Sequence, residues 1–538
     1  MRTTRLLHQR YLTYIALTRP SERLWVSYPQ SDESGRALAP ARVFRRLLEL
    51  FPDQPVRHIV SPLQLPPGDL MRLAGVLAAR LRTNPALAAD ALMLHWLHIV
   101  EADPVGQRII EAAAYTNGVP DLRPETVTAL YGQAAGDSGG RAWLRSSVSR
   151  LEEFANCPFR HFATFGLKLR EWQQPEVDSL LWGQFVHAVL ERLLRLLKHD
   201  VESGKLAGWE RLNGDEALPY LKDAFTQVET GLARELPASP QLRFQVRLLY
   251  ELLQAALPAL VRQISAGEFQ PLGLEVAFGP SRDSATDDLA SGALVIPLPG
   301  GGRLELRGRI DRVDVAVVDD DIYVRVIDYK TGSRSGWRLD DVVDGLALQL
   351  LVYLMVAVRW AASRVGNSAT ARPAGLFFFP VVRLWRKNDA ADRLSAAPEK
   401  VAEEWLRLYK LRGLVVCDHP VPALMDGSVA AGGRSSLVPL ELTKDGQPYR
   451  NSRKQVGDAD MQALLSYAEQ KMAQLASAIL SGDITISPWS KPKKVACTYC
   501  PYHAFCWFDR KFPANSFRYL ARRNDTQLWQ QIREATNR

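Results

Sequence analysis

The sequence predicts an α/β protein, because a β-hairpin signature lies between segments with helical periodicity. In the stretch 303–332, two runs rich in Val, Ile, Leu and Tyr flank an acidic turn at 319–321. Apolar residues at helical spacing over 180–197 and 345–362 predict helices on either side of the hairpin in the sequence. Two further strands are expected, at 271–280 and at 376–382.

The predicted hairpin places two acidic residues opposite each other on its two strands. A hairpin closing at 319–321 pairs residues whose numbers sum to about 640, and Asp311 and Asp328 sum to 639. Opposed Cβ atoms lie roughly 5 Å apart, where like charges are destabilising unless a divalent cation offsets them. Lys330 projects from the same face of its strand as Asp328. The alternative is a solvated charged face, but the apolar residues around these side chains favour a hydrolytic metal site.

Length and composition limit the class of protein. A chain of 538 residues is long enough for two or three domains. Its 47% apolar and 23% charged residues are typical of a soluble globular protein. No apolar run approaches the ~20 residues of a membrane span, and we find no signal-peptide pattern. We therefore expect a cytoplasmic protein without membrane contact. The net charge of +8 favours a polyanionic partner.

The cysteines predict a metal centre. The five are Cys157, Cys417, Cys497, Cys500 and Cys506, of which the last three form CxxCx5C. Three clustered thiols need a fourth ligand, and the candidates are Cys157, Cys417 and His503. Four such ligands hold zinc or an iron–sulfur cluster. A lone upstream ligand such as Cys157 favours a cluster that ties together the ends of a domain, with zinc as the alternative. Cys417 is then a buried, inert thiol.

Three polar residues on the predicted helices and strands are further candidates. His187 follows Gly183 by one helical turn, and a lone histidine on an apolar helix is more often a core residue than a ligand. Gln349 and Tyr353 share one face of the helix at 345–362, and a buried glutamine amide needs partners.

The beginning of the chain carries a possible nucleotide motif. YIALTR at 14–19, followed by SERL at 21–24, resembles motif VI of superfamily 1 helicases. In that family the arginine that Arg19 matches reaches the γ-phosphate of ATP. The alternative is a basic amphipathic helix ending at 18–20, followed by a strand at 24–28. Because GxxxxGK[ST] occurs nowhere in the sequence, we do not expect a self-sufficient ATPase.

Composition, together with the motifs at the beginning of the chain, in the hairpin and at the cysteines, leads us to expect four parts. They are a helicase-like remnant at 1–60, an Ala- and Leu-rich helical connector at 61–144, a catalytic domain at 145–515, and a basic tail at 516–538. The connector ends in the glycine-rich stretch AAGDSGGR, which has the composition of a flexible link.

Four motifs in chain order resemble those of RecB-family PD-(D/E)XK nucleases. They are GxxxH at 183–187, GRID at 308–311, DYK at 328–330 and QLLVY at 349–353. The CPF sequence at Cys157, with the C-terminal CxxCx5C, resembles the iron-staple subgroup, which includes AddB proteins and the nucleases of CRISPR adaptation. With the motif at 14–19, the whole chain is similar to the C-terminal part of the AddB proteins of AddAB-type helicase–nucleases.

The resemblance implies a restriction-endonuclease-like core, a central mixed sheet flanked by helices. It implies that Mg2+ is held by His187, Asp311, Asp328 and the backbone carbonyl of Tyr329. In the same way, Lys330 would act on the attacking water or the transition state, and Gln349 and Tyr353 would position the scissile phosphate. A 4Fe-4S cluster would be held by Cys157, Cys497, Cys500 and Cys506. Glu275 stands where some relatives carry an accessory acid.

The function implied is a Mg2+-dependent DNA exonuclease that degrades the 5′-terminated strand. It would act with an AddA-like subunit, as a heterodimer, in double-strand break repair by homologous recombination. Two alternatives remain open. One is a DNA-end-binding or docking scaffold whose nuclease is inactive without its motor partner. The other is a stand-alone nuclease like those of CRISPR adaptation.

Overall fold

The computed structural model of the chain divides into two compact units, residues 1–115 and 116–538. It describes residues 2–30, 36–54, 56, 98, 108, 115–132, 143–170, 179–235, 239–279, 289–290, 294–299, 301–332, 336–365, 370–381, 405–429, 432–449, 453–492, 494–512 and 514–536. Most of the predicted helical connector at 61–144 lies outside these residues.

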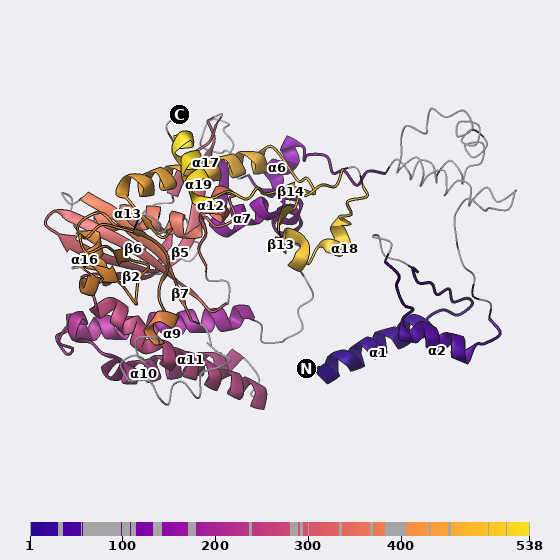
Figure 1. Ribbon diagram of the computed structural model, residues 1–538, viewed down its shortest axis with the longest axis horizontal. Helices are drawn as coiled ribbons and strands as arrows, with labels where there is room; N and C mark the ends of the chain where they lie inside the picture. The colour runs from indigo at the N-terminus through magenta and orange to yellow at the C-terminus, as the bar shows by residue number, and fades with distance from the viewer. Residues whose placement is uncertain are drawn as a thin grey trace. The chain divides into compact units, whose positions relative to one another are not determined.

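The first unit contains two described helices, α1 (Arg2–Thr18) and α2 (Arg42–Leu50) (Figure 1). The prediction that the first helix ends near residue 18 is confirmed. The hydroxyl of Thr18 donates to the carbonyl of Tyr14 at 2.8 Å within the last turn. The strand considered at 24–28 does not form, because these residues have no regular secondary structure.

The second unit is built on a mixed sheet of nine strands, which confirms the predicted α/β class. Seven strands follow the order β11-β8-β7-β6-β5-β2-β3, and β1 and β4 pair with the first part of β5. These strands are β1 (Trp143–Ser147), β2 (Gln270–Phe278), β3 (Leu289–Ala290), β4 (Leu294–Pro297), β5 (Arg303–Val318), β6 (Asp321–Lys330), β7 (Thr370–Pro380), β8 (Arg412–Val416) and β11 (Gln455–Val456). Two small sheets comprise β9 (Gly433–Arg434) with β10 (Glu441–Leu442), and β12 (Trp489–Lys491) with β13 (Lys494–Val495) and β14 (Arg518–Tyr519).

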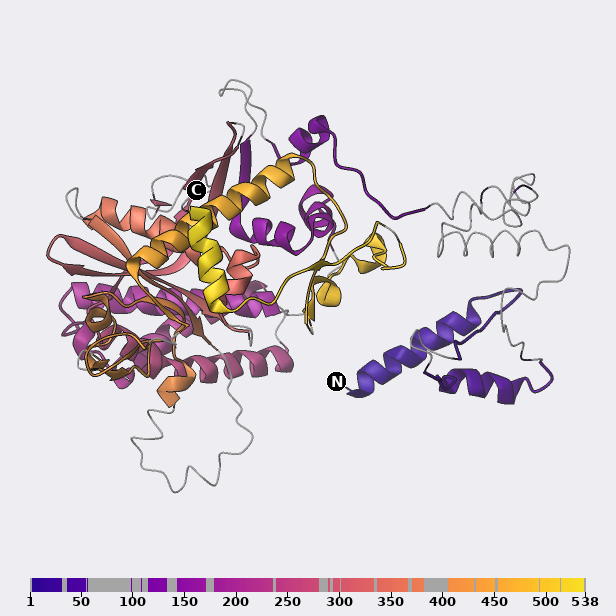
Figure 2. The ribbon, with the colours of Figure 1, turned by 45° about the horizontal axis from the view of Figure 1, so that its top comes forward.

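Helices cover both faces of the large sheet. Figures 1 and 2 show α9, α10 and α11 grouped on one side, and α17 and α19 on the other. The helix α13 packs directly on β6 and β7, and α17 packs on α13. The described α-helices of this unit are α6 (Pro124–Leu130), α7 (Val148–Asn156), α8 (Pro158–His161), α9 (Ser179–Glu202), α10 (Gly214–Glu235), α11 (Pro240–Ser265), α12 (Leu339–Val343), α13 (Gln349–Val365), α16 (Val421–Met425), α17 (Asp458–Leu480), α18 (His503–Cys506) and α19 (Asp525–Thr536).

The sequence segment predicted to be a basic tail ends in a packed helix. Leu528 and Ile532 of α19 are buried, with 2% and 0% of their surfaces exposed. The helix packs against α17 and α12. The last helix is therefore part of the second compact unit.

The hairpin has the predicted register. Antiparallel pairing of β5 with β6 joins residues whose numbers sum to 639, from Val318 with Asp321 to Arg312 with Ile327. The turn is one residue shorter than expected, since Asp321 already belongs to β6. Asp319 takes a φ of 52°, a left-handed conformation that aspartate tolerates better than most residues. β6 and the part of β5 from Ile310 to Asp314 are buried, as the run of apolar residues indicates.

A buried ion cluster lies beside the pairing that sets this register. Asp314 accepts from Nε and Nη2 of Arg312 at 2.6 and 2.7 Å, and from Nε of Arg325 at 2.9 Å. The side chains of all three residues are fully buried. Arg325 also donates to the carbonyl of Gln263 on α11 at 3.1 Å. One carboxylate is therefore the shared partner of two guanidinium groups inside the core.

We expect Asp314→Asn to lower the free energy of unfolding by about 3–5 kcal/mol, because it leaves two buried guanidinium groups without a counter-charge. Chemical denaturation followed by circular dichroism measures the change. Glu469→Gln is the control, because it neutralises an exposed pair with Arg359 and should change stability by less than about 1 kcal/mol. Equal effects of the two substitutions would contradict the importance of the buried cluster.

Candidate active site

Three carboxylates occupy neighbouring positions across β2, β5 and β6. The pairing of β2 with β5 places Glu275 opposite Asp311, since the residues on either side of each are paired. The pairing of β5 with β6 runs to Arg312 and Ile327, and Asp311 and Asp328 come next on the two strands. The three acidic side chains are 12%, 8% and 2% exposed in the order of the strands. Three carboxylates with little exposure thus lie in one row.

The helix α9 brings His187 to this row. Its Nδ1 lies 3.3 Å from Asp311 Oδ2 and 3.9 Å from Glu275 Oε1. Its Nε2 lies 2.9 Å from the carbonyl oxygen of Tyr329, whose own N–H donates to Asp311 Oδ2 at 2.9 Å. Burial alone lowers the pKa of His187, but the hydrogen bond to Asp311 and the surrounding acidic charges raise it to about 9. The Nδ1 atom of the imidazole therefore faces the carboxylates of Asp311 and Glu275.

Lys330, Gln349 and Tyr353 meet at Asp328. The ammonium of Lys330 lies 2.5 Å from Asp328 Oδ2. Gln349 Nε2 donates to Asp328 Oδ1 at 3.1 Å and to the hydroxyl oxygen of Tyr353 at 2.8 Å. Lys330 Nζ also donates to Gln349 Oε1 at 3.5 Å. The structure therefore joins the end of β6 to the first turn of α13. The contact of Gln349 with Tyr353 agrees with their i, i+4 spacing on one helix face.

The side chains in this row fit a hard divalent cation. Ligand atoms of His187, Glu275 and Asp311 all lie within 4.8 Å of one another. Among the described residues, the buried oxygens Glu275 Oε1 and Asp328 Oδ2 have no hydrogen-bond partner, although Lys330 forms an ion pair with the second. Carboxylate oxygens with open coordination positions are the ligands that Mg2+ prefers.

The pKa values of the acids report the crowding of charge. Burial, followed by the charges of Asp311 and Glu191, raises the pKa of Glu275 to about 7. Burial and the charge of Asp311 also raise the pKa of Asp328, against the effect of Lys330. Both carboxylates are therefore held in surroundings that disfavour their ionised forms unless positive charge is near.

Away from this row, four cysteines line a cavity, which we call the cysteine cage. Its thiols are Cys157, Cys497, Cys500 and Cys506, and its apolar wall includes Phe159, Ile486 and Phe508. Cys157 caps the end of α7, and Cys506 ends α18. Burial raises the pKa of the Cys157 and Cys506 thiols, and burial together with the neighbouring sulfurs raises that of Cys497 to about 12.

The other two candidates for the fourth ligand do not line the cage. Cys417 follows β8, and its thiol donates to the carbonyl of Val456 at 3.1 Å. His503 lies on α18, but it is not among the residues around the cavity. Cys157 is therefore the thiol that the fold brings to CxxCx5C.

Sequence reasoning underrated one site residue and missed another. The sequence indicates Glu275 only as a possible accessory acid, but its carboxylate lies within 4.8 Å of the ligand atoms of His187 and Asp311, close enough to share a cation with them. Glu152 was not singled out, although its carboxylate accepts from the N–H groups of Leu348 and Gln349 at 2.6 and 3.0 Å. Helical spacing places Glu152 four residues after the buried Val148, and a carboxylate on a buried helix face was the available signal.

Comparison with known families defines the class of protein. Residues 145–507 match the model of the PD-(D/E)XK nuclease superfamily. This match includes the row of carboxylates, His187 and the four cysteines of the cage. The chain therefore belongs to the PD-(D/E)XK nuclease superfamily.

Comparison with curated proteins is more particular. The chain is 36% identical to the B subunit of the ATP-dependent helicase/deoxyribonuclease of Desulforudis audaxviator, over 97% of this chain and 43% of that protein. Similar matches are found to the proteins of the same name from Moorella thermoacetica, at 36% identity over 96% of this chain and 43% of the relative, and Geobacillus kaustophilus, at 30% identity over 96% and 43%. The predicted resemblance to AddB proteins is confirmed. The chain spans less than half the length of these relatives.

The structure also bears on membrane association. Among the described residues, no helix has the length and apolar character needed to cross a membrane.

We expect Mg2+ or Mn2+ to stabilise the protein through the row of carboxylates. A ligand at 100 times its dissociation constant stabilises a folded protein by about 2.7 kcal/mol. Asp311→Asn should abolish this stabilisation, because Asp311 contacts both His187 and the backbone of Tyr329. Thermal unfolding with and without the cation measures it.

The matched control is Asp320→Asn, the same substitution at the exposed turn of the same hairpin. It should leave the cation-dependent stabilisation unchanged. If Asp311→Asn keeps the full stabilisation, the cation binds elsewhere.

Proposed function

We propose that the chain is the nuclease-bearing part of an AddB-type protein and hydrolyses DNA with Mg2+. The observation that carries this proposal is the row of Glu275, Asp311 and Asp328 beside Lys330 in a PD-(D/E)XK fold. His187, Asp311 and Asp328, with the carbonyl of Tyr329, would hold the cation, and Glu275 lies within reach of the same position. When bound, Mg2+ supplies an acidified water and neutralises charge on the phosphate undergoing attack.

The residues around the cation position have separate roles in this proposal. Lys330 is one-third exposed, so its ammonium can donate to the attacking water or to a phosphate oxygen. Gln349 donates to the hydroxyl oxygen of Tyr353, which leaves the Tyr353 proton available to a phosphate oxygen. Both side chains come from the first turns of one helix, so they would orient the scissile phosphate together.

We further propose that the cysteine cage holds a 4Fe-4S cluster. Tetrahedral zinc with bonds of ~2.3 Å brings its sulfurs within roughly 4 Å of one another. Among the described residues, which include all five cysteines, no three of the thiols approach within 4.8 Å of one another. Their wider arrangement around one apolar cavity supports a cluster over a single zinc ion.

The names of the relatives support wider proposals about substrate and partner. Each of those proteins is named as the B subunit of an ATP-dependent helicase/deoxyribonuclease. We infer that this chain acts on the 5′-terminated DNA strand within a heterodimer with an AddA-like subunit, in recombinational repair of double-strand breaks. The net charge of +8 suits a polyanionic substrate. Residues 1–60, with Arg19, would then be the end of a helicase-like domain.

The second candidate function is a DNA-binding scaffold whose nuclease needs its motor partner. The ion pair of Lys330 with Asp328 favours this alternative in one respect, because Asp328 must release the lysine to serve a cation or a phosphate. A partner or DNA would supply that rearrangement.

We expect the purified chain to degrade single-stranded DNA with Mg2+, and Asp328→Asn to reduce the rate by on the order of 10³-fold. The substitution removes a negative oxygen from the cation position and the partner of Lys330. A gel assay with end-labelled DNA measures the rate, and Asp320→Asn is again the control. Cleavage that survives Asp328→Asn excludes this site. Cleavage that appears only with an AddA-like subunit and ATP favours the scaffold.

We expect anaerobically purified protein to be brown and to contain about four iron atoms per chain. Cys500→Ser should remove the colour and the iron, because Cys500 lines the cage. Cys417→Ser should keep both, because Cys417 lies outside the cage. Iron analysis and the visible absorption spectrum measure the outcome. Colourless wild-type protein with stoichiometric zinc would refute the cluster.

A further inference from the structure

Glu152 connects two parts of the fold that are far apart in the sequence. It lies on α7, and its Oε1 accepts from the N–H groups of Leu348 and Gln349 at 2.6 and 3.0 Å. The first N–H groups of a helix lack partners within the helix. The carboxylate of Glu152 therefore caps the beginning of α13 from another helix, where a negative charge also suits the helix dipole.

The capped turn is the turn that carries the polar residues of the active site. Gln349 reaches both Asp328 and Tyr353 with its amide nitrogen. A shift of this backbone moves Gln349 away from Asp328 and Lys330, because its side chain makes all of these contacts from one position. Burial raises the pKa of Glu152 to about 7, against the two backbone hydrogen bonds and the charge of Lys330. Its carboxylate thus depends on these partners for its charge.

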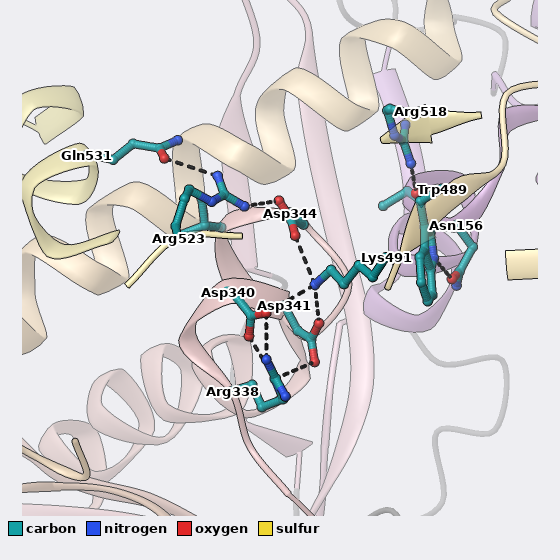
Figure 3. Close-up of polar contacts among 12 residues, drawn as sticks. Asn156, Arg338, Asp340, Asp341, Asp344, Trp489, Lys491, Arg518, Arg523 and Gln531 are labelled. Carbon is teal, nitrogen blue, oxygen red and sulfur yellow. Dashed lines mark hydrogen bonds and ion pairs between the residues drawn. The ribbon is translucent and has the colours of Figure 1, made fainter. Parts of the chain in front are cut away.

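The C-terminal end of α7, one turn after Glu152, lies at the cysteine cage. Cys157 follows the last residue of the helix and donates its N–H to the carbonyl of Glu153. Trp489 Nε1 donates to Asn156 Oδ1 at 2.7 Å, and Arg518 donates to the carbonyl of Ala155 (Figure 3). Trp489 and Arg518 lie on β12 and β14, the strands on either side of CxxCx5C in the sequence. The strands that precede and follow the other three cage cysteines therefore hydrogen-bond to the last turn of α7.

A second connection reaches α13 from the same strands. Lys491 of β12 lies 2.6 Å from Asp341 and 3.0 Å from Asp344, just before α13 in the sequence. Figure 3 shows Arg523 paired with Asp344 from the opposite side. This ion cluster holds the chain that enters α13 against β12. Both connections converge on the residues before Gln349.

We propose that Glu152 is a positioning residue that couples the cysteine cage to the active site by holding the first turn of α13. The inference rests on the proposed nuclease function and on a filled cage. The second half of α7 is the rigid connection, since the helix runs from Glu152 to Cys157 over roughly 7–8 Å. Loss of the group in the cage releases Cys157, the last turn of α7 relaxes, and Glu152 withdraws from the two N–H groups.

Hydrogen exchange of the full chain tests this coupling without reference to activity. Glu152→Ala should raise exchange at Leu348 and Gln349 by at least about tenfold, with iron content equal to that of the wild type. Glu152→Gln keeps an acceptor oxygen and should exchange close to the wild type. Cys500→Ser should raise exchange at the same amides. Combined with Glu152→Ala, it should add little, because both changes break one connection. Glu469→Ala, on the surface of α17, is the control.

The kinetics of DNA cleavage distinguish a positioning role of Glu152 from a role in the stability of the fold alone. Glu152→Ala should lower kcat by on the order of 10²-fold through misplacement of Gln349, with little change in KM. Glu152→Gln should recover most of kcat.

Two results would overturn the coupling. One is wild-type exchange of the α13 amides in Cys500→Ser. The other is loss of iron from Glu152→Ala to the level of Cys500→Ser, which would make Glu152 a support of the cage alone. A wild-type protein without nuclease activity would contradict the proposed function instead, and hydrogen exchange would still decide whether the cage and α13 are coupled.

Discussion

The buried pairing of Asp314 with Arg312 and Arg325 is the interaction on which the rest of the site depends. A strand that slips by one residue turns every side chain to the opposite face. Such a slip would separate a fully buried carboxylate from its two guanidinium groups, at a cost of several kcal/mol. The register of β5 with β6 is therefore strongly specified. Asp311 and Asp328 follow directly, and their opposition is a consequence of this core pairing.

The fold thus places repelling charges together at the end of a well-anchored hairpin. Glu275 extends the row from β2, His187 lies beside Glu275 and Asp311, and Lys330 supplies positive charge beside Asp328. Raised carboxylate pKa values and buried oxygens without hydrogen bonds mark a site with unused affinity for a cation. Such pre-organised charge is what phosphodiester hydrolysis requires, since charge must be stabilised where it develops.

The cage and the active site are less separate than their distance in the sequence implies. Cys157 ends the helix that carries Glu152, and Glu152 caps the helix that carries Gln349. Lys491 of β12, the strand shortly before CxxCx5C in the sequence, also pairs with Asp341 in the chain that enters α13. A cluster in the cage would accordingly do more than tie the ends of a domain, because its loss would release the first turn of α13, which carries Gln349.

Local pattern in the sequence determined the hairpin, its register and the shared face of Gln349 and Tyr353. These features follow from strand and helix periods that act over a few residues. Motif resemblance added His187 and the choice of Cys157 among three candidate ligands. Only the tertiary structure decided that Glu275 lies opposite Asp311 and that Glu152 caps α13. Both contacts join segments that are distant in the chain, and no local period relates such segments, because their meeting depends on how the sheet and helices pack.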